Sequence, residues 1–165
     1  MAALTPGSTA PDFSLSTLDG KKFSLREALT RGPVVLAFFK VSCPTCQYAF
    51  PFLERLFHAY KNQGVTLIGV SQNPAEDTAA FVKEYRVTFP IALDDTRKFA
   101  VSNAYGLTNV PTLFWVEPDG EIEITSVGWN KAEFEKINQR MAESGKLSVV
   151  MPFRSGEEVR DFRAG

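Results

Sequence analysis

The sequence predicts a single α/β domain, in which a central mixed β-sheet is flanked by helices and preceded by an N-terminal β-hairpin. A continuous apolar run over residues 33–39 has the pattern of a strand buried on both faces, and residues 65–70 are expected to form a second buried strand. Segments of helical periodicity alternate with strand-like runs, which is typical of parallel strands joined by helices. Towards the end of the chain, two short strand-like segments flank Pro118-Asp119-Gly120, a turn sequence that predicts an antiparallel hairpin.

The first part of the chain contains the predicted N-terminal hairpin and a short helix. Residues 11–15 and a segment around residues 22–23 flank Leu18-Asp19-Gly20, a turn sequence because glycine tolerates positive φ. Ser24 and Glu27 have the spacing of a capping box, so we expect a helix to begin there and to end at Gly32-Pro33.

The apolar run over residues 33–39 leads directly into a Cys-x-x-Cys motif, and a helix is expected to start at that motif. Pro51 falls inside this helix and is expected to kink it. Asn130 and Glu133 repeat the capping-box spacing at the start of the final helix. In order along the chain we expect helices over residues 43–62, 74–85, 96–105 and 130–144, and strands over residues 65–70, 89–93, 113–116 and 122–127.

Composition and charge limit the classes of function. The chain has 165 residues, of which 44% are hydrophobic and 22% charged, as expected of one domain with a packed core. Its formal net charge is -1 and its basic residues are spread along the sequence, so we expect no nucleic-acid partner. The apolar run over residues 33–39 is far shorter than the ~18 residues of a membrane span.

The first seven residues lack the basic and apolar regions of a signal peptide. This predicts a cytoplasmic protein as the sequence stands, and a periplasmic or extracytoplasmic one if an export leader has been removed.

The only two cysteines, Cys43 and Cys46, are the candidate catalytic residues. A bridge between residues so close in sequence closes too short a loop to stabilise a scaffold, so chemistry explains the pair better. At the start of a helix, the first thiol lies over unpaired backbone N–H groups, which favour its thiolate. We therefore expect Cys43 to attack a disulfide, and Cys46, shielded one turn further on, to resolve the mixed disulfide.

A metal site is not expected, because zinc usually requires four ligands and the chain offers two cysteines and one histidine. If the helix continues through Pro51, twelve residues place His58 about 18 Å from Cys46, outside any shared coordination sphere. No cofactor is expected either.

Four features resemble the thioredoxin superfamily, and within it the TlpA/ResA-type and redoxin branch related to AhpC-TSA proteins. They are Ala10-Pro11-Asp12-Phe13, the strand leading to Cys43-x-x-Cys46, Pro51, and Asn109-Val110-Pro111-Thr112. The resemblance covers roughly residues 8–145 and implies a thioredoxin-like fold. It also implies that Pro111 is a cis-proline beside the disulfide, and that the backbone of Val110 pairs with an extended substrate chain.

The sequence departs from this family's pattern at three positions. Ser42 stands where thioredoxins usually have Trp, which alters the rim of the docking surface. Ala37 and Ala49 stand where thioredoxins and TlpA/ResA-type proteins, respectively, place an acidic proton acceptor for the second cysteine. Cys46 would then lose its proton to water or to the departing thiolate, which could slow the release of reduced substrate.

Three further residues are auxiliary candidates. Pro44 and Thr45, between the cysteines, are expected to tune the redox potential. Lys40 could supply a cation that lowers the pKa of Cys43, although a solvated lysine at the end of a strand is the alternative.

Two other functions compete with thiol-disulfide exchange. A peroxiredoxin-like thiol peroxidase would share the Ala-Pro-Asp-Phe opening and Cys-Pro-Thr. However, peroxiredoxins place Thr or Ser at the position of Lys40, and an arginine near that of Pro111. The second alternative is a non-catalytic thioredoxin-like domain that binds an extended peptide or another protein.

We divide the chain into a thioredoxin-like domain over residues 1–146 and a C-terminal extension over residues 147–165. The extension is too apolar for a free tail, so residues 149–153 are expected to pack on the domain, the alternative being a frayed terminus. The resulting prediction is a monomeric thiol-disulfide oxidoreductase that acts on protein disulfide or dithiol substrates and exchanges electrons with an unidentified redox partner.

Overall fold

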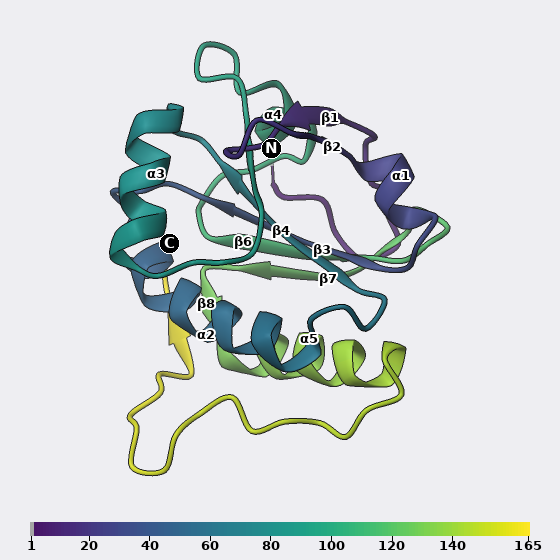
Figure 1. Cartoon of the computed structure of the whole chain (residues 1–165), viewed down its shortest axis with the longest axis vertical. Coiled ribbons are helices and arrows are strands. Elements are labelled where there is room, and N and C mark those ends of the chain that lie inside the picture. Colours follow the sequence, from purple (N-terminus) through teal and green to yellow (C-terminus); the bar gives the residue numbers. More distant parts are fainter. Residues whose placement is uncertain (1) are drawn as a thin grey trace.

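A computed structural model describes residues 2–165 and contains a five-stranded mixed sheet of order β5-β4-β3-β6-β7 (Figure 1). The sheet and its flanking helices confirm the expected α/β architecture. Strands β4 and β5 run parallel to the central strand β3, whereas β6 is antiparallel to β3 and to β7. The strands are β3 (Val34–Phe39), β4 (Thr66–Ser71), β5 (Ile91–Leu93), β6 (Thr112–Val116) and β7 (Ile122–Val127).

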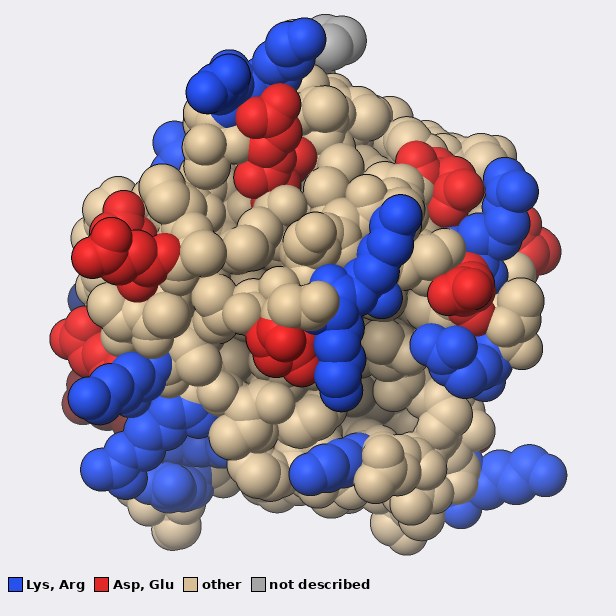
Figure 2. Space-filling view, turned by 45° about the horizontal axis from the view of Figure 1, so that its top comes forward, with Lys and Arg blue, Asp and Glu red and all other residues tan. Residues whose placement is uncertain are grey.

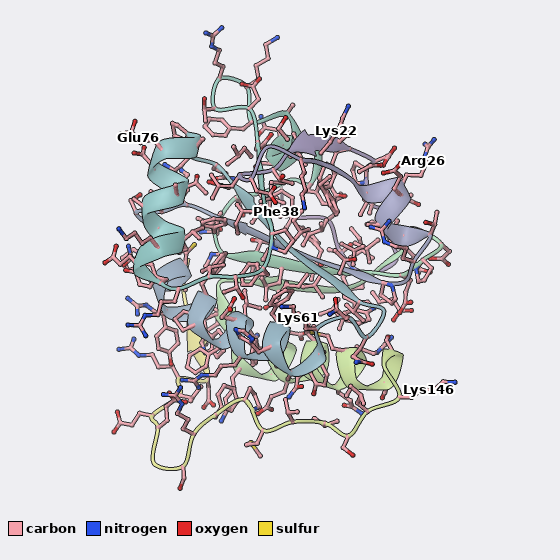
Figure 3. All side chains as sticks on the ribbon, in the orientation of Figure 1. Lys22, Arg26, Phe38, Lys61, Glu76 and Lys146 are labelled. Carbon is pink, nitrogen blue, oxygen red and sulfur yellow. The ribbon has the colours of Figure 1, made fainter. Side chains whose placement is uncertain are left out.

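Strand β3 is buried along its whole length because both faces of the sheet are covered. Successive side chains of a strand point to opposite faces. Phe39 packs against Phe50 and Phe81, whereas Phe38 packs against Tyr105 and Phe114. Figure 3 shows Phe38 near the centre of the view, whereas Lys22, Arg26 and Lys146 project from its outline.

Five helices surround the sheet in residues 2–165. Phe50 and Phe81 belong to α2 and α3, which therefore contact the same face of β3. Helices α2 and α5 lie side by side, and α1 and α4 lie on the other side of the sheet (Figure 1). The helices are α1 (Leu25–Leu29), α2 (Pro44–Tyr60), α3 (Ala75–Glu84), α4 (Ala100–Ala104) and α5 (Lys131–Ser144).

The N-terminal hairpin is confirmed. Strands β1 (Ser14–Ser16) and β2 (Lys22–Ser24) pair in antiparallel fashion, and the capping box begins α1 as expected. The Ser24 hydroxyl accepts a hydrogen bond of 3.3 Å from the backbone N–H of Glu27. Pro51 lies inside α2.

The helix expected over residues 96–105 is shorter, because α4 begins only at Ala100. Phe99 has a left-handed backbone (φ 49°), which a helix interior excludes. The buried carboxylate of Asp94 accepts hydrogen bonds from the backbone N–H groups of Val101 and Ser102, so a side chain outside the predicted segment caps the helix.

Residues 147–165 return along α5 and α2 and end beside the start of α2 (Figure 1, yellow). The Phe153 ring packs against those of Phe52, Trp129 and Phe134. Strand β9 (Phe162–Arg163) pairs with β8 (Trp129–Asn130). The boundary between domain and extension at residue 146 stays a prediction.

On the face shown in Figure 2, acidic side chains are interspersed among the lysines and arginines. None of the helices in residues 2–165 has the length and apolar character needed to cross a membrane.

Candidate active site

Cys43 occupies the N-cap of α2, directly after the loop that follows β3. Its backbone is extended (φ -82°, ψ 114°), and its sulfur accepts a hydrogen bond of 3.1 Å from the backbone N–H of Cys46. Pro44 occupies the first turn, where its missing N–H has no helical partner to lose. The positive end of the helix dipole therefore faces the Cys43 sulfur.

These surroundings lower the pKa of Cys43 from its ordinary value of 9.0 to about 6. The largest cause is the hydrogen bond from the Cys46 side chain. The backbone N–H groups of Cys46 and Thr45 contribute in the same direction, as does the charge of Arg163, against the opposing effect of partial burial. Cys43 is half-buried, so its sulfur combines thiolate character with access from solvent.

Cys46 is fully buried. Burial raises the pKa of its thiol above the ordinary value, and its hydrogen bond to Cys43 acts in the same direction. Ala37 and Ala49 are also buried and supply no proton acceptor. The two thiols thus differ in burial and in the direction in which their pKa values shift.

The loop before β6 approaches the first cysteine. The Val110–Pro111 peptide bond is cis. The Cys43 thiol donates a hydrogen bond of 3.3 Å to the Val110 carbonyl oxygen, and the Thr112 hydroxyl donates one of 2.8 Å to the carbonyl oxygen of Asn109. The structure therefore brings together the four candidate residues Cys43, Cys46, Val110 and Pro111, which come from distant segments of the sequence.

The auxiliary candidates Thr45 and Lys40 differ in burial and in their contacts with the cysteine motif. Thr45 is buried and its hydroxyl donates a hydrogen bond of 2.6 Å to the carbonyl oxygen of Ala164. The side chain of Lys40 is exposed at the end of β3, although its carbonyl oxygen accepts from the N–H of Cys43 at 3.3 Å. His58 lies on the surface of α2, where it pairs with Glu54 at 2.8 Å.

Arg163 is the site residue that sequence reasoning missed. It lies in β9, and its guanidinium is 5.6 Å from the centre of the Tyr48 ring in α2. Its charge is the one that lowers the pKa of Cys43, a role considered for Lys40 at the sequence level. No sequence motif identifies Arg163 as a site residue, because the path of residues 147–165 in the folded chain brings it to the site.

Histidine, cysteine and carboxylate side chains do not gather in threes anywhere in residues 2–165 in a way that could hold a metal ion. Two adjacent thiols can exchange two electrons with the disulfide of a partner molecule through a mixed disulfide, a reaction that requires no metal ion.

The fold and the paired thiols define a thioredoxin-fold thiol-disulfide oxidoreductase. The AhpC/TSA family model matches residues 6–125, and the chain belongs to this family. The sequence is 35% identical over 122 residues to the thiol-disulfide oxidoreductase ResA of Geobacillus thermodenitrificans, covering 73% of this chain and 68% of that protein. It is 34% identical over 123 residues to ResA of Bacillus subtilis, covering 73% and 66%. The chain thus spans about two thirds of the length of these relatives.

Solved structures show the same fold. The thioredoxin domain of a thiol-disulfide oxidoreductase from Bacteroides vulgatus superposes with a TM-score of 0.75 at 23% identity, covering 84% of this chain and 99% of that one. The peroxidoxin BcpB from Mycobacterium tuberculosis superposes with a TM-score of 0.68 at 20% identity, covering 87% and 97%. The fold is therefore shared with peroxidoxins, but the sequence relatives are thiol-disulfide oxidoreductases and do not favour the peroxidase or binding-only alternatives.

Proposed function

We propose that Cys43 is the attacking thiol and Cys46 the resolving thiol of a reversible exchange with disulfides of proteins or small thiols. The observation that carries this assignment is the contrast between the two sulfurs. Cys43 is half-buried, capped by backbone N–H groups and low in pKa, whereas Cys46 is buried and high in pKa.

In the reducing direction, the Cys43 thiolate attacks one sulfur of the substrate disulfide. A bond forms between Cys43 and that sulfur, and the other substrate sulfur leaves as a thiolate. Cys46 then gives its proton to water or to the departing thiolate and attacks the Cys43 sulfur. The Cys43–Cys46 disulfide forms and the second substrate thiolate leaves, so the substrate gains two electrons and the protein loses them.

The loop at Val110 and Pro111 is the proposed substrate-positioning element. Its carbonyl oxygen at Val110 already lies within hydrogen-bond distance of the Cys43 thiol. An extended chain that pairs with the Val110 backbone would hold its own sulfur beside Cys43. Pro44 and Thr45 are proposed to set the redox potential from inside the motif, and the exposed Lys40 to act as an auxiliary charge.

The proposed partners are protein disulfides or dithiols and a separate redox protein that restores the active form of the pair. We propose a monomer that works without a cofactor. A cytoplasmic location, as expected from the sequence, would favour a reductase, whereas an extracytoplasmic location would leave either direction of exchange open.

Trapping the intermediate tests the roles of the two thiols. When reduced Cys46→Ser protein is mixed with native insulin, whose disulfides are intact, a mixed disulfide on Cys43 should accumulate, because no thiol remains to resolve it. The matched Cys43→Ser variant should form almost none, since Cys46 is buried. Equal trapping by both variants, or trapping by Cys43→Ser alone, would contradict the assignment.

A further inference from the structure

The last residues of the chain lie against the proposed active site. The residues concerned are 160–165, named below the 160–165 segment. It enters beside α2, where the N–H of Arg160 donates to the Tyr48 hydroxyl at 3.0 Å and the carbonyl oxygen of Arg160 accepts from the Trp129 indole at 2.6 Å. Two strand residues of the segment then pair with β8, and the Asp161 carbonyl oxygen accepts from the N–H of Lys131 at 2.9 Å.

Beyond the strand pairing, the segment reaches the cysteine motif and the cis-proline loop. The Ala164 carbonyl oxygen accepts the hydrogen bond from Thr45, which lies between the two cysteines. The Gly165 carbonyl oxygen lies 3.5 Å from the side-chain amide nitrogen of Asn109. The segment thus contacts both sides of the site, the start of α2 and the loop that contains Val110.

The contact is a backbone-to-backbone approach that side chains would prevent. A Cβ atom added to Gly165 would lie 2.1 Å from the carbonyl oxygen of Val110, and one added to Gly128 would lie 2.6 Å from that of Arg163. Such an approach is typical of two chains lying side by side, with glycine where they come closest. The Val110 carbonyl is also the group that accepts the hydrogen bond from Cys43.

We propose that the 160–165 segment occupies the surface on which an extended segment of a protein substrate docks beside Cys43, so that a protein disulfide reaches Cys43 only after this segment is displaced. The inference rests on the proposed function, in which an extended chain pairs with Val110. One backbone edge cannot accept both chains, because the carbonyl oxygen of Val110 already has Gly165 against it. A small disulfide needs no extended pairing and reaches the half-buried Cys43 sulfur without this displacement.

The segment is held by contacts that can be released without unfolding the domain. Phe162, Ala164 and Gly165 are exposed, and the aromatic cluster around Phe153 anchors the chain further upstream. The apparent affinity for a protein substrate equals the intrinsic affinity multiplied by the fraction of time that the site is free. If the segment is in place for more than about four fifths of the time, its release should speed the reaction of a protein disulfide at least about fivefold.

Gly165→Leu in the full chain tests this inference, because its side chain cannot fit against Val110. Ala164→Ser is the matched control, since this neighbouring side chain is exposed and its backbone contact with Thr45 is unaltered. Hydrogen exchange of the 160–165 amides reports release of the segment. Single-turnover reactions of the reduced proteins with native insulin and with glutathione disulfide measure the rates of reduction of a protein disulfide and of a small disulfide.

We expect faster amide exchange in Gly165→Leu, at least about fivefold faster reduction of insulin, and a change of less than about twofold with glutathione disulfide. Ala164→Ser should match the wild type. Retention of the segment in Gly165→Leu would overturn the inference, as would release without faster insulin reduction, or equal acceleration of both substrates. Failure of the proposed function looks different: none of the proteins would exchange with either disulfide.

Discussion

Replacement of Cys46 by alanine is expected to raise the pKa of Cys43, because the hydrogen bond from the Cys46 side chain is the largest cause of its low value. In the wild type this pKa is about 6 instead of 9.0. At pH 7 a thiol with a pKa of 6 is about 90% thiolate, whereas one with a pKa of 9 is about 1% thiolate. The thiolate population thus differs by a factor of about 90.

The difference in reaction rate is smaller, because a thiolate of lower pKa is also a weaker nucleophile. With a Brønsted slope of about 0.45, the fall in pKa lowers intrinsic reactivity about 20-fold. The net gain at pH 7 is about four- to fivefold, so the midpoint of the pH profile is more informative than a single rate.

The assay is the rate of alkylation by iodoacetamide as a function of pH. We expect a midpoint near pH 6 for the wild type and a higher midpoint for Cys46→Ala. Cys46→Ser keeps a side-chain donor, so its midpoint should lie closer to that of the wild type. A wild-type midpoint near 9, or an unchanged midpoint in Cys46→Ala, would refute this explanation of the low pKa.

The same pKa values determine how the stability of the reduced protein depends on pH. Cys43 has a lower pKa in the folded chain than in the unfolded one, so its thiolate adds stability that is complete above pH 9 and is lost as the pH falls through 6. The pKa of Cys46 shifts in the opposite direction. Its contribution to the free energy of unfolding is therefore present below its ordinary pKa and is lost as the pH rises above that value.

Three further predictions concern the surroundings of the site. Phe153→Ala should lower the free energy of unfolding by about 1–3 kcal/mol in denaturant titrations, because the substitution removes a partly buried ring from an aromatic cluster. Met151→Ala, at an 81% exposed position, should change it by less than about 0.5 kcal/mol, and equal losses would contradict the packing argument. Ala49→Glu should speed resolution of the mixed disulfide in quenched time courses, because it supplies the missing proton acceptor. Ala49→Gln is the control of similar size, and equal rates in both variants would disprove that role. The Arg55 guanidinium, 2.7 Å from Glu157, lowers the pKa of that carboxyl to about 2, so this ion pair should lose its stabilising effect as the pH falls from about 4.5 towards 2. Glu157→Gln should remove this acid dependence and Glu158→Gln should keep it; the opposite pattern would refute the assignment.

Local sequence signals predicted the elements that carry the cysteines. The apolar run before the motif is β3, and the helix beginning at Cys43 is α2. Both follow from short-range physics, since an uninterrupted apolar run favours a strand buried on both faces and Pro44 is suited to the first turn of a helix.

The features that sequence reasoning missed depend on contacts between distant residues. The first turn of the helix expected at residue 96 is absent because Asp94 caps a later start. Thr45 and Ala164 are 119 residues apart, and the strand that brings them together has only two residues, too few to show a periodic pattern. The contribution of Arg163 to the Cys43 site therefore became visible only in three dimensions.

The redox titration of the Cys43/Cys46 couple tests the central claim most directly. The protein would be equilibrated in glutathione buffers of increasing potential, and the fraction of alkylated thiols followed by mass. The proposed exchange predicts one reversible transition with the slope of a two-electron couple, in which both cysteines change together. A pair that fails to titrate, or a Cys43 that peroxide converts to sulfenic acid far faster than disulfides react with it, would contradict the account.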